Sequence, residues 1–155
     1  EVTVVLSGMN EESHIAENLA IADKALPNLL TEAELKLVEE AGRTYRTLMK
    51  VPCTGCGYCM PCPSEVSIPR CFDIYNKMHL FGNDVEAKFS YALSMGGAFS
   101  GTRSYASQCV RCEECLEKCP QHIEIPDFLE MVAEEMEDED LEKRVAIGKK
   151  MLNME

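Results

Sequence analysis

Positive charge is scarce in this sequence. Lys and Arg together number 15 and Asp and Glu 27, which gives a formal net charge of -12 at pH 7. Proteins that bind nucleic acids gain most of that binding energy when Lys and Arg side chains displace counterions from phosphates. We therefore expect no nucleic-acid partner, and a cationic protein surface suits this chain better.

Long hydrophobic runs are missing as well. No stretch approaches the roughly 18 consecutive apolar residues that cross a bilayer, and Glu1-Val2-Thr3 lacks the charged and apolar regions of a signal peptide. We expect no membrane contact and a cytoplasmic location. The chain also lacks an initiator Met, and this favours a piece cut from a longer polypeptide.

The nine cysteines do not fit a disulfide framework, because their number is odd and no secretory signal is present. Eight of them fall into two dense runs, and in a reducing compartment such thiolates are typical metal ligands. The ninth, Cys71, stands apart. We interpret it as a small buried side chain on a helix rather than as a ligand.

The second run has the C-x2-C-x2-C-x3-C-P spacing of bacterial two-cluster ferredoxins. Three cysteines spaced in this way wrap around one [4Fe-4S] cluster, and the fourth, followed by Pro120, binds the other cluster. The first run keeps this pattern with one residue fewer before its last cysteine, and Gly55 and Gly57 allow its backbone to turn tightly. The sequence therefore predicts two [4Fe-4S] clusters with exchanged fourth ligands. The predicted sets are Cys53, Cys56, Cys59 and Cys119 for one cluster, and Cys109, Cys112, Cys115 and Cys62 for the other.

Three alternatives stay open at this point. The short spacing before Cys62 also permits a local set made of the first run alone. Zinc is the second alternative, although zinc sites use two separated pairs and would leave a third cysteine over in each run. His122, close to Cys119, is a candidate extra ligand or proton carrier, but we prefer a partly buried packing role for it.

An internal repeat relates residues 62–69 to residues 119–126, with Cys, Pro, a β-branched residue, Ile and Pro at matching positions. Each half thus consists of a cysteine run, an extended exit and a helix, which predicts two halves facing each other about a pseudo-twofold axis. The expected fold is mainly α, an α-helical ferredoxin-like domain preceded by a short orphan strand and a helix.

The remaining elements are read from periodicity and end signals. The strand is the β-branched run Val2–Leu6. Six helices are expected. The first runs from Asn10 to before Pro27, the second follows the capping box Thr31-Glu34, and the third runs from Pro69 to Gly82. The fourth is capped by Asp84, the fifth starts at Pro126, and the last follows a solvated acidic break at Glu137–Asp140. The inward positions are Leu37 or Val38, Ala41, Tyr45, Leu48, Cys71, Ile74, Tyr75, Met78, Val85, Phe89, Ala92, Leu129, Val132 and Met136. Residues 96–101 are interpreted as a loop, not a phosphate cradle.

Two strings resemble a known family. Val51-Pro-Cys-Thr-Gly-Cys-Gly-Tyr-Cys-Met-Pro-Cys-Pro and Cys119-Pro-Gln-His-Ile-Glu-Ile-Pro are similar to the C-terminal ferredoxin-like extension of bacterial and archaeal iron–sulfur aldo/keto reductases. The first residues are similar to the last barrel strand and helix of that family. The resemblance implies that residues 1–26 end a truncated barrel, that residues 27–155 form the ferredoxin-like domain, and that an upstream barrel, on the same or a separate chain, is a partner.

The resemblance also implies part of an NADP site, at Ser7, Gly8, Glu17 and Asn18. The family's catalytic Asp, Tyr, Lys and His belong to earlier strands, so we expect no catalytic residue in this chain, and Tyr45, Tyr58 and His79 do not replace them. The leading hypothesis is an electron-transfer module that serves a redox protein partner, within an NADP-linked oxidoreductase. The alternatives are clusters that act as structural staples or sensors, and a stand-alone iron–sulfur subunit of another redox complex.

Overall fold

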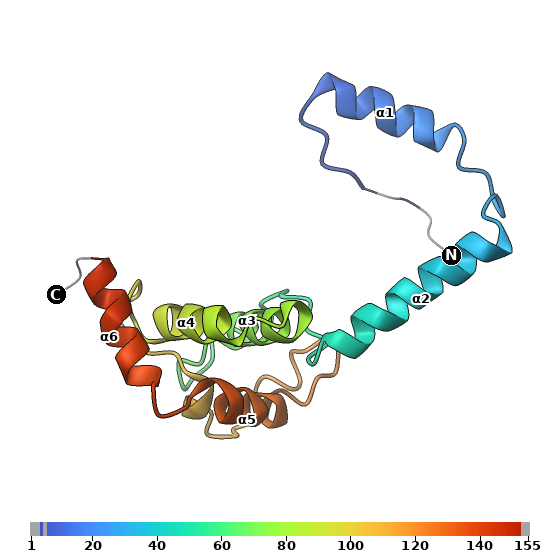
Figure 1. The fold of residues 1–155 in the computed structure, drawn as a ribbon. Helices are drawn as coiled ribbons and strands as arrows, with labels where there is room; N and C mark the ends of the chain where they lie inside the picture. Colours follow the sequence, from blue (N-terminus) through green and yellow to red (C-terminus); the bar gives the residue numbers. More distant parts are fainter. Residues whose placement is uncertain (1–3, 5, 153–155) are drawn as a thin grey trace. The chain divides into compact units, whose positions relative to one another are not determined.

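The computed structural model describes residue 4 and residues 6–152, and within them the fold is mainly α, as predicted (Figure 1). The helices are α1 (Glu12–Ala22), α2 (Glu32–Leu48), α3 (Ile68–Phe81), α4 (Asp84–Met95), the short 3-10 helix η1 (Ala106–Gln108), α5 (Ile125–Met136) and α6 (Leu141–Met151). The chain divides into two compact units, one up to Ala41 and one from Gly42 onward. The predicted boundary between residues 26 and 27 stays a prediction.

The first unit contains the run Val2–Leu6, for which the sequence predicts a strand. Val4 and Leu6 are irregular and exposed, and the other residues of that run lie outside the described ones. Helix α1 ends at Ala22, earlier than predicted, because the chain then makes consecutive turns through Lys24 and Ala25.

The capping box that starts α2 is confirmed. The backbone N–H of Thr31 donates to Glu34 Oε2 at 2.8 Å, and the N–H of Glu34 donates to Thr31 Oγ1 at 3.3 Å. The inward face predicted for α2 is wrong, since no residue of this helix is buried. An amphipathic pattern buries side chains only where a second surface packs against it.

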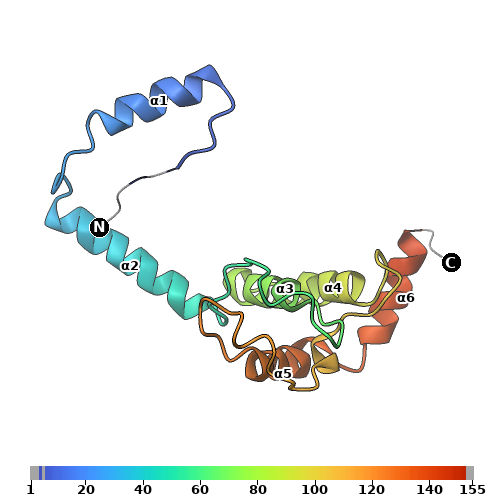
Figure 2. The same ribbon diagram turned by 180° about the vertical axis from the view of Figure 1, so that it is seen from behind.

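The second unit has its core between α3, α4 and α5, with α6 packed across α4 (Figures 1 and 2). The inward positions predicted for α3 and α5 are confirmed, as all seven are buried: Cys71, Ile74, Tyr75, Met78, Leu129, Val132 and Met136. Helix α3 has Pro69 in its first turn and ends at Phe81. Gly82 caps it with a φ of 63°, the left-handed conformation that glycine tolerates.

The predictions for α4 need correction. Asn83, not Asp84, caps this helix, because its side chain accepts a hydrogen bond from the N–H of Glu86 at 3.2 Å. Of the predicted inward residues, Ala92 is buried as expected, Phe89 is half-buried, and Val85 is 83% exposed. Ala87 and Tyr91 are buried instead. Tyr91 sets this orientation, since its hydroxyl has partners inside the unit.

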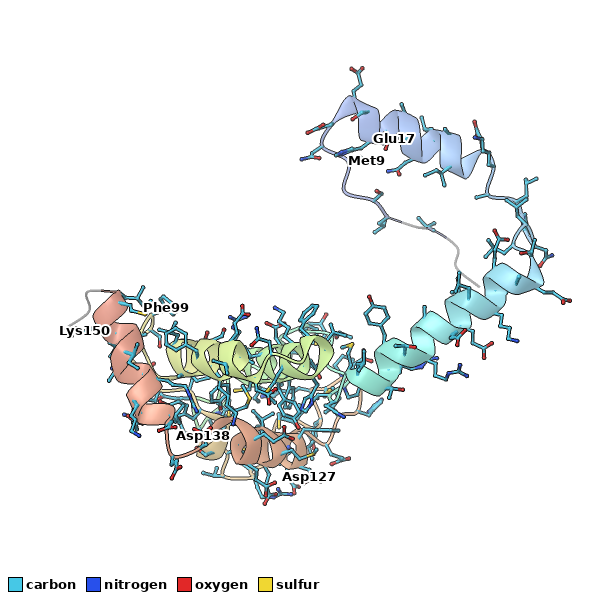
Figure 3. All side chains as sticks on the ribbon, in the orientation of Figure 1. Met9, Glu17, Phe99, Asp127, Asp138 and Lys150 are labelled. Carbon is cyan, nitrogen blue, oxygen red and sulfur yellow. The ribbon has the colours of Figure 1, made fainter. Side chains whose placement is uncertain are left out.

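The acidic segment between α5 and α6 is not simply solvated, contrary to the prediction. Asp138 is half-buried and pairs with Lys88 of α4 at 2.9 Å and Arg144 of α6 at 2.6 Å. The hydrogen bond from Lys88, together with that from Arg144, lowers the pKa of Asp138 to about 2. This corner (labelled at Asp138 in Figure 3) therefore ties three helices together. Residues 96–101 form turns and no helix or strand, as predicted.

Candidate metal centre

The internal repeat extends to the backbone. Glu65 and His122 occupy matching positions and both have left-handed φ angles, 60° and 52°. The N–H of Glu65 donates to the carbonyl of Cys62 at 3.0 Å, and the N–H of His122 donates to that of Cys119 at 3.1 Å. The same turn thus leads each cysteine run into its helix. His122 is exposed, so the packing role predicted for it is wrong; its position serves the turn.

The two cysteine loops, residues 53–59 and 109–115, also share their backbone conformation. Gly55 and Gly57 have φ angles of 70° and 77°, and the matching residues Arg111 and Glu113 have 55° and 65°. Side chains disfavour this region. Four residues in the left-handed region at two matching pairs of positions indicate that ligand placement dictates the loop.

Two cavities gather the cysteines of these runs. One is lined by Cys53, Cys56, Cys59 and Cys119, with apolar neighbours from α3 and the second exit. The other is lined by Cys62, Cys109, Cys112 and Cys115, and it also reaches Cys59. Each cavity therefore combines three cysteines of one run with the last cysteine of the other, and the two cavities adjoin at Cys59. Cys62 lines the second cavity and not the first.

Burial acts against charged thiolates in both cavities. It raises the pKa of Cys59, with the neighbouring Cys53 and Cys56 adding to the effect. It also raises the pKa of Cys115, to about 11. Bound iron is the type of charge that stabilises thiolates in such an environment.

The donor set fits [4Fe-4S] clusters. All nine cysteines are free, and no three His, Cys, Asp or Glu side chains among the described residues are placed to hold one metal ion. A [4Fe-4S] cluster would take one cysteine thiolate at each of its four irons. The four cysteine sulfurs would therefore surround the cluster and would not converge on one point. Quartets of cysteine thiolates are the ordinary ligands of these clusters.

The chain entering the first run is held by Asn76, a buried residue of α3. Its side chain accepts a hydrogen bond from the N–H of Val51 at 2.9 Å and donates to the Val51 carbonyl at 2.7 Å. Sequence reasoning missed Asn76. The available signal was a polar residue between the inward positions Tyr75 and Met78.

The chain entering the second run is held differently. The hydroxyl of Tyr91 donates to Glu137 Oε1 at 2.6 Å and accepts from the N–H of Ala106 at 2.9 Å. Glu137 also accepts from the N–H of Ser107 at 3.1 Å. Burial, with the nearby Cys71 and Glu137, raises the pKa of Tyr91, so the hydroxyl keeps its proton. Tyr91 and Glu137 thus fix η1 just before Cys109.

Cys71 is fully buried on α3 and lines neither cavity, which agrees with its predicted packing role. Its sulfur lies 3.5 Å from Met95 Sδ and 4.0 Å from the Tyr91 hydroxyl. Burial raises the pKa of its thiol to about 12, so it stays neutral.

The residues predicted to bind NADP belong to the first unit. Asn18 Nδ2 donates to Ser7 Oγ at 3.2 Å, which brings two of them together. Glu17 is exposed on α1 (Figure 3), and Gly8 lies in the irregular segment before this helix.

The tyrosines and histidine considered above as substitutes for the missing catalytic residues form no acid–base site. Tyr45 and Tyr58 are exposed. His79 lies 3.2 Å from Glu135, whose other oxygen accepts the hydroxyl of Tyr75 at 2.6 Å. This group links α3 to α5.

Residues 52–124 match the family model of the 4Fe-4S dicluster domain. The match spans both cysteine runs, and it indicates an iron–sulfur electron-transfer module with 4Fe-4S clusters. It carries no link to aldo/keto reductases. No curated protein and no solved structure matches the chain. Over the described residues, no helix has the length and apolar character to cross a membrane.

Proposed function

We propose that the chain binds two [4Fe-4S] clusters, one through Cys53, Cys56, Cys59 and Cys119 (site 1) and one through Cys62, Cys109, Cys112 and Cys115 (site 2), and that it relays single electrons between them. The observation that carries the proposal is the pair of adjoining cavities, each lined by three cysteines of one run and the last cysteine of the other.

A [4Fe-4S] cluster supplies a one-electron redox couple when bound. The chain's own residues shield each site from water and expose one edge of it. Cys59 and Cys119 are buried and exclude water from the inner side of site 1, whereas Cys56 and Cys112 are exposed and give each site an edge for exchange with a redox protein. Because the cavities adjoin at Cys59, electron passage between the sites needs no movement of the fold.

Metal analysis and redox titration test the proposal together. Anaerobically prepared protein should contain about eight iron and eight sulfide per chain, and reduction followed by EPR should be reversible. Clusters that bind but cannot be reversibly reduced would support the structural or sensing alternative and refute electron transfer. An iron content of two or fewer per chain would overturn the cluster assignment itself.

Exchange of the fourth ligands is tested in a variant that keeps only one site. Replacing Cys53, Cys56 and Cys59 by Ser should leave about four iron, all at site 2. In that background, Cys62→Ser should lower the iron content or change the EPR spectrum, and the matched variant Cys119→Ser should do neither. The reverse outcome would favour a local set in each run.

The link to an aldo/keto reductase barrel is a finer proposal, which rests on the two sequence strings. The test is the natural reading frame upstream of Glu1. A frame that encodes a barrel with the catalytic Asp, Tyr, Lys and His supports the NADP-linked oxidoreductase, and a frame without one favours a stand-alone subunit.

A further inference from the structure

The two sites differ in the charges around them. The cavity of site 1 is lined by no charged side chain within the described residues. The cavity of site 2 is lined by two carboxylates, Glu113 and Glu114, and one ammonium, Lys118. Since the loops share one backbone conformation, this difference comes from side chains alone.

More negative charge surrounds the loop of site 2. Arg111 cannot offset the glutamates, because it is paired with Asp127 of α5 (labelled in Figure 3) and with Glu130 at 3.1 Å. Two carboxylates therefore oppose this one guanidinium. Glu117, also in the run, is exposed and adds to the negative charge.

Positive charge lies beside site 1 instead. A groove next to Cys53 and Thr54 is lined by Arg70, Lys77 and Asp73 of α3. Asp73 pairs with both cations, at 2.7 Å and 2.9 Å, so this cluster retains an excess positive charge.

One hydrogen bond also favours a higher reduction potential at site 1 than at site 2. The N–H of Gly55 donates to Cys53 Sγ at 3.4 Å, and no matching bond to Cys109 is found in the described part of the chain. Donors to the sulfurs stabilise the reduced, more negative state of a cluster, and neighbouring carboxylates destabilise it. The deeper burial of Cys59 and Cys119 acts in the opposite direction, because burial destabilises the more negative, reduced state and so lowers the potential of site 1. The net charge near a site, however, acts on its whole redox couple and not on single ligands.

We propose that these side chains set the two sites at different potentials, with site 1 above site 2. An electron taken from a one-electron donor protein at the acidic loop beside Cys112 would then pass to site 1 and on to a one-electron acceptor protein beside Cys56. The inference rests on the proposed function. It assigns Glu113 and Glu114 as residues that lower the potential of site 2, and Arg70 and Lys77 as residues that raise that of site 1. We expect at least about a tenfold difference in the reduced-to-oxidised ratio, about 59 mV for a one-electron couple.

An EPR-monitored redox titration of the anaerobic holoprotein tests this. The wild type should show two separate one-electron waves. In the double variant Glu113→Gln and Glu114→Gln, the lower wave alone should move up. Lys118→Gln should move the same wave down, and Arg70→Gln with Lys77→Gln should move the upper wave down. These opposite signs cannot come from a general loss of structure.

The inference is overturned if the wild-type waves coincide, if the glutamate variant moves the upper wave, or if the glutamate and Lys118 variants move a wave in the same direction. In each of these outcomes the clusters are still reduced reversibly, so the proposed function stands. Failure of reversible reduction in the wild type would instead refute electron transfer, and the two failures are thus distinct.

Discussion

The two cysteine loops reach one backbone conformation with different residues. The first loop uses Gly55 and Gly57 for its left-handed positions, and the second uses Arg111 and Glu113. Glycine reaches this region without steric cost, whereas a side chain there costs about 1 kcal/mol. In the second loop the strained residues contribute charge and an ion pair to α5. The loop conformation is therefore the same in both halves, while the charges around the loops differ.

Loss of one ligand should produce the largest effect on this pair of sites. Cys115→Ser removes a thiolate from site 2, and we expect the iron content to fall from about eight to about four per chain. The thermal stability should fall as well, since cluster binding supplies folding free energy. Iron analysis and a melting curve by circular dichroism measure both effects.

Cys71→Ser is the matched control, because Cys71 is equally a thiol of the core but lines neither cavity. It should keep about eight iron. If its iron content fell as in Cys115→Ser, Cys71 would have to be counted among the ligands.

The next effect concerns the two entering segments, which are held by unlike residues. Asn76→Ala removes both hydrogen bonds to Val51 in a buried position and should destabilise the holoprotein by about 2–3 kcal/mol. Tyr91→Phe leaves the Ala106 N–H without its partner and the Glu137 carboxylate with only the N–H of Ser107, and it should cost about 1–3 kcal/mol. Denaturant unfolding under anaerobic conditions measures both values.

The two variants should also differ in which site loses its iron first. Asn76→Ala should release iron from site 1 first, because Val51 leads into Cys53, and Tyr91→Phe should release it from site 2. Equal loss from both sites in both variants would show that the two halves respond as one.

The regular parts of this fold were predictable from the sequence. Pro69 and Pro126 fix helix starts, and the inward positions of α3 and α5 follow from their spacing. The cysteine spacing alone led to the quartets that line the two cavities. These features depend on residues close together in the chain.

The missed features depend on long-range contacts. Asn76 and Tyr91 bind backbone groups 25 and 15 residues away, so no local pattern marks them. Asp138 was interpreted as solvated because its partners Lys88 and Arg144 come from other helices. The orientation of α4 depends on the same contacts, and its inward face was therefore predicted incorrectly at Val85.

Asp138 gives a smaller effect, confined to the end of the second half. Its pKa is lowered to about 2 in the folded chain, so its contribution is complete above the unfolded pKa and is lost as the pH falls through 2. Asp138→Asn should therefore cost about 1–2 kcal/mol after allowance for solvent screening. Unfolding by urea at pH 7 measures this difference. A variant as stable as the wild type at this pH would contradict the lowered pKa.

The smallest effects come from exchanging the residue types of the two loops. Gly57→Ala introduces a Cβ that meets no atom within 4 Å, so its cost of about 1 kcal/mol is purely conformational. Glu113→Gly relieves strain of about 1 kcal/mol at the matching position. The greater entropy of glycine in the unfolded chain offsets part of this gain, so the variant should be more stable by only about 0.5 kcal/mol. Opposite signs at matching positions are expected only if the backbone, and not the side chain, is what the cluster site requires.

Gly101→Ala is the control, since Gly101 has the same conformation with φ 77° and equal space but lies outside both cavities. It should cost as much stability as Gly57→Ala without altering the rate at which iron is lost to a chelator, whereas Gly57→Ala should raise that rate.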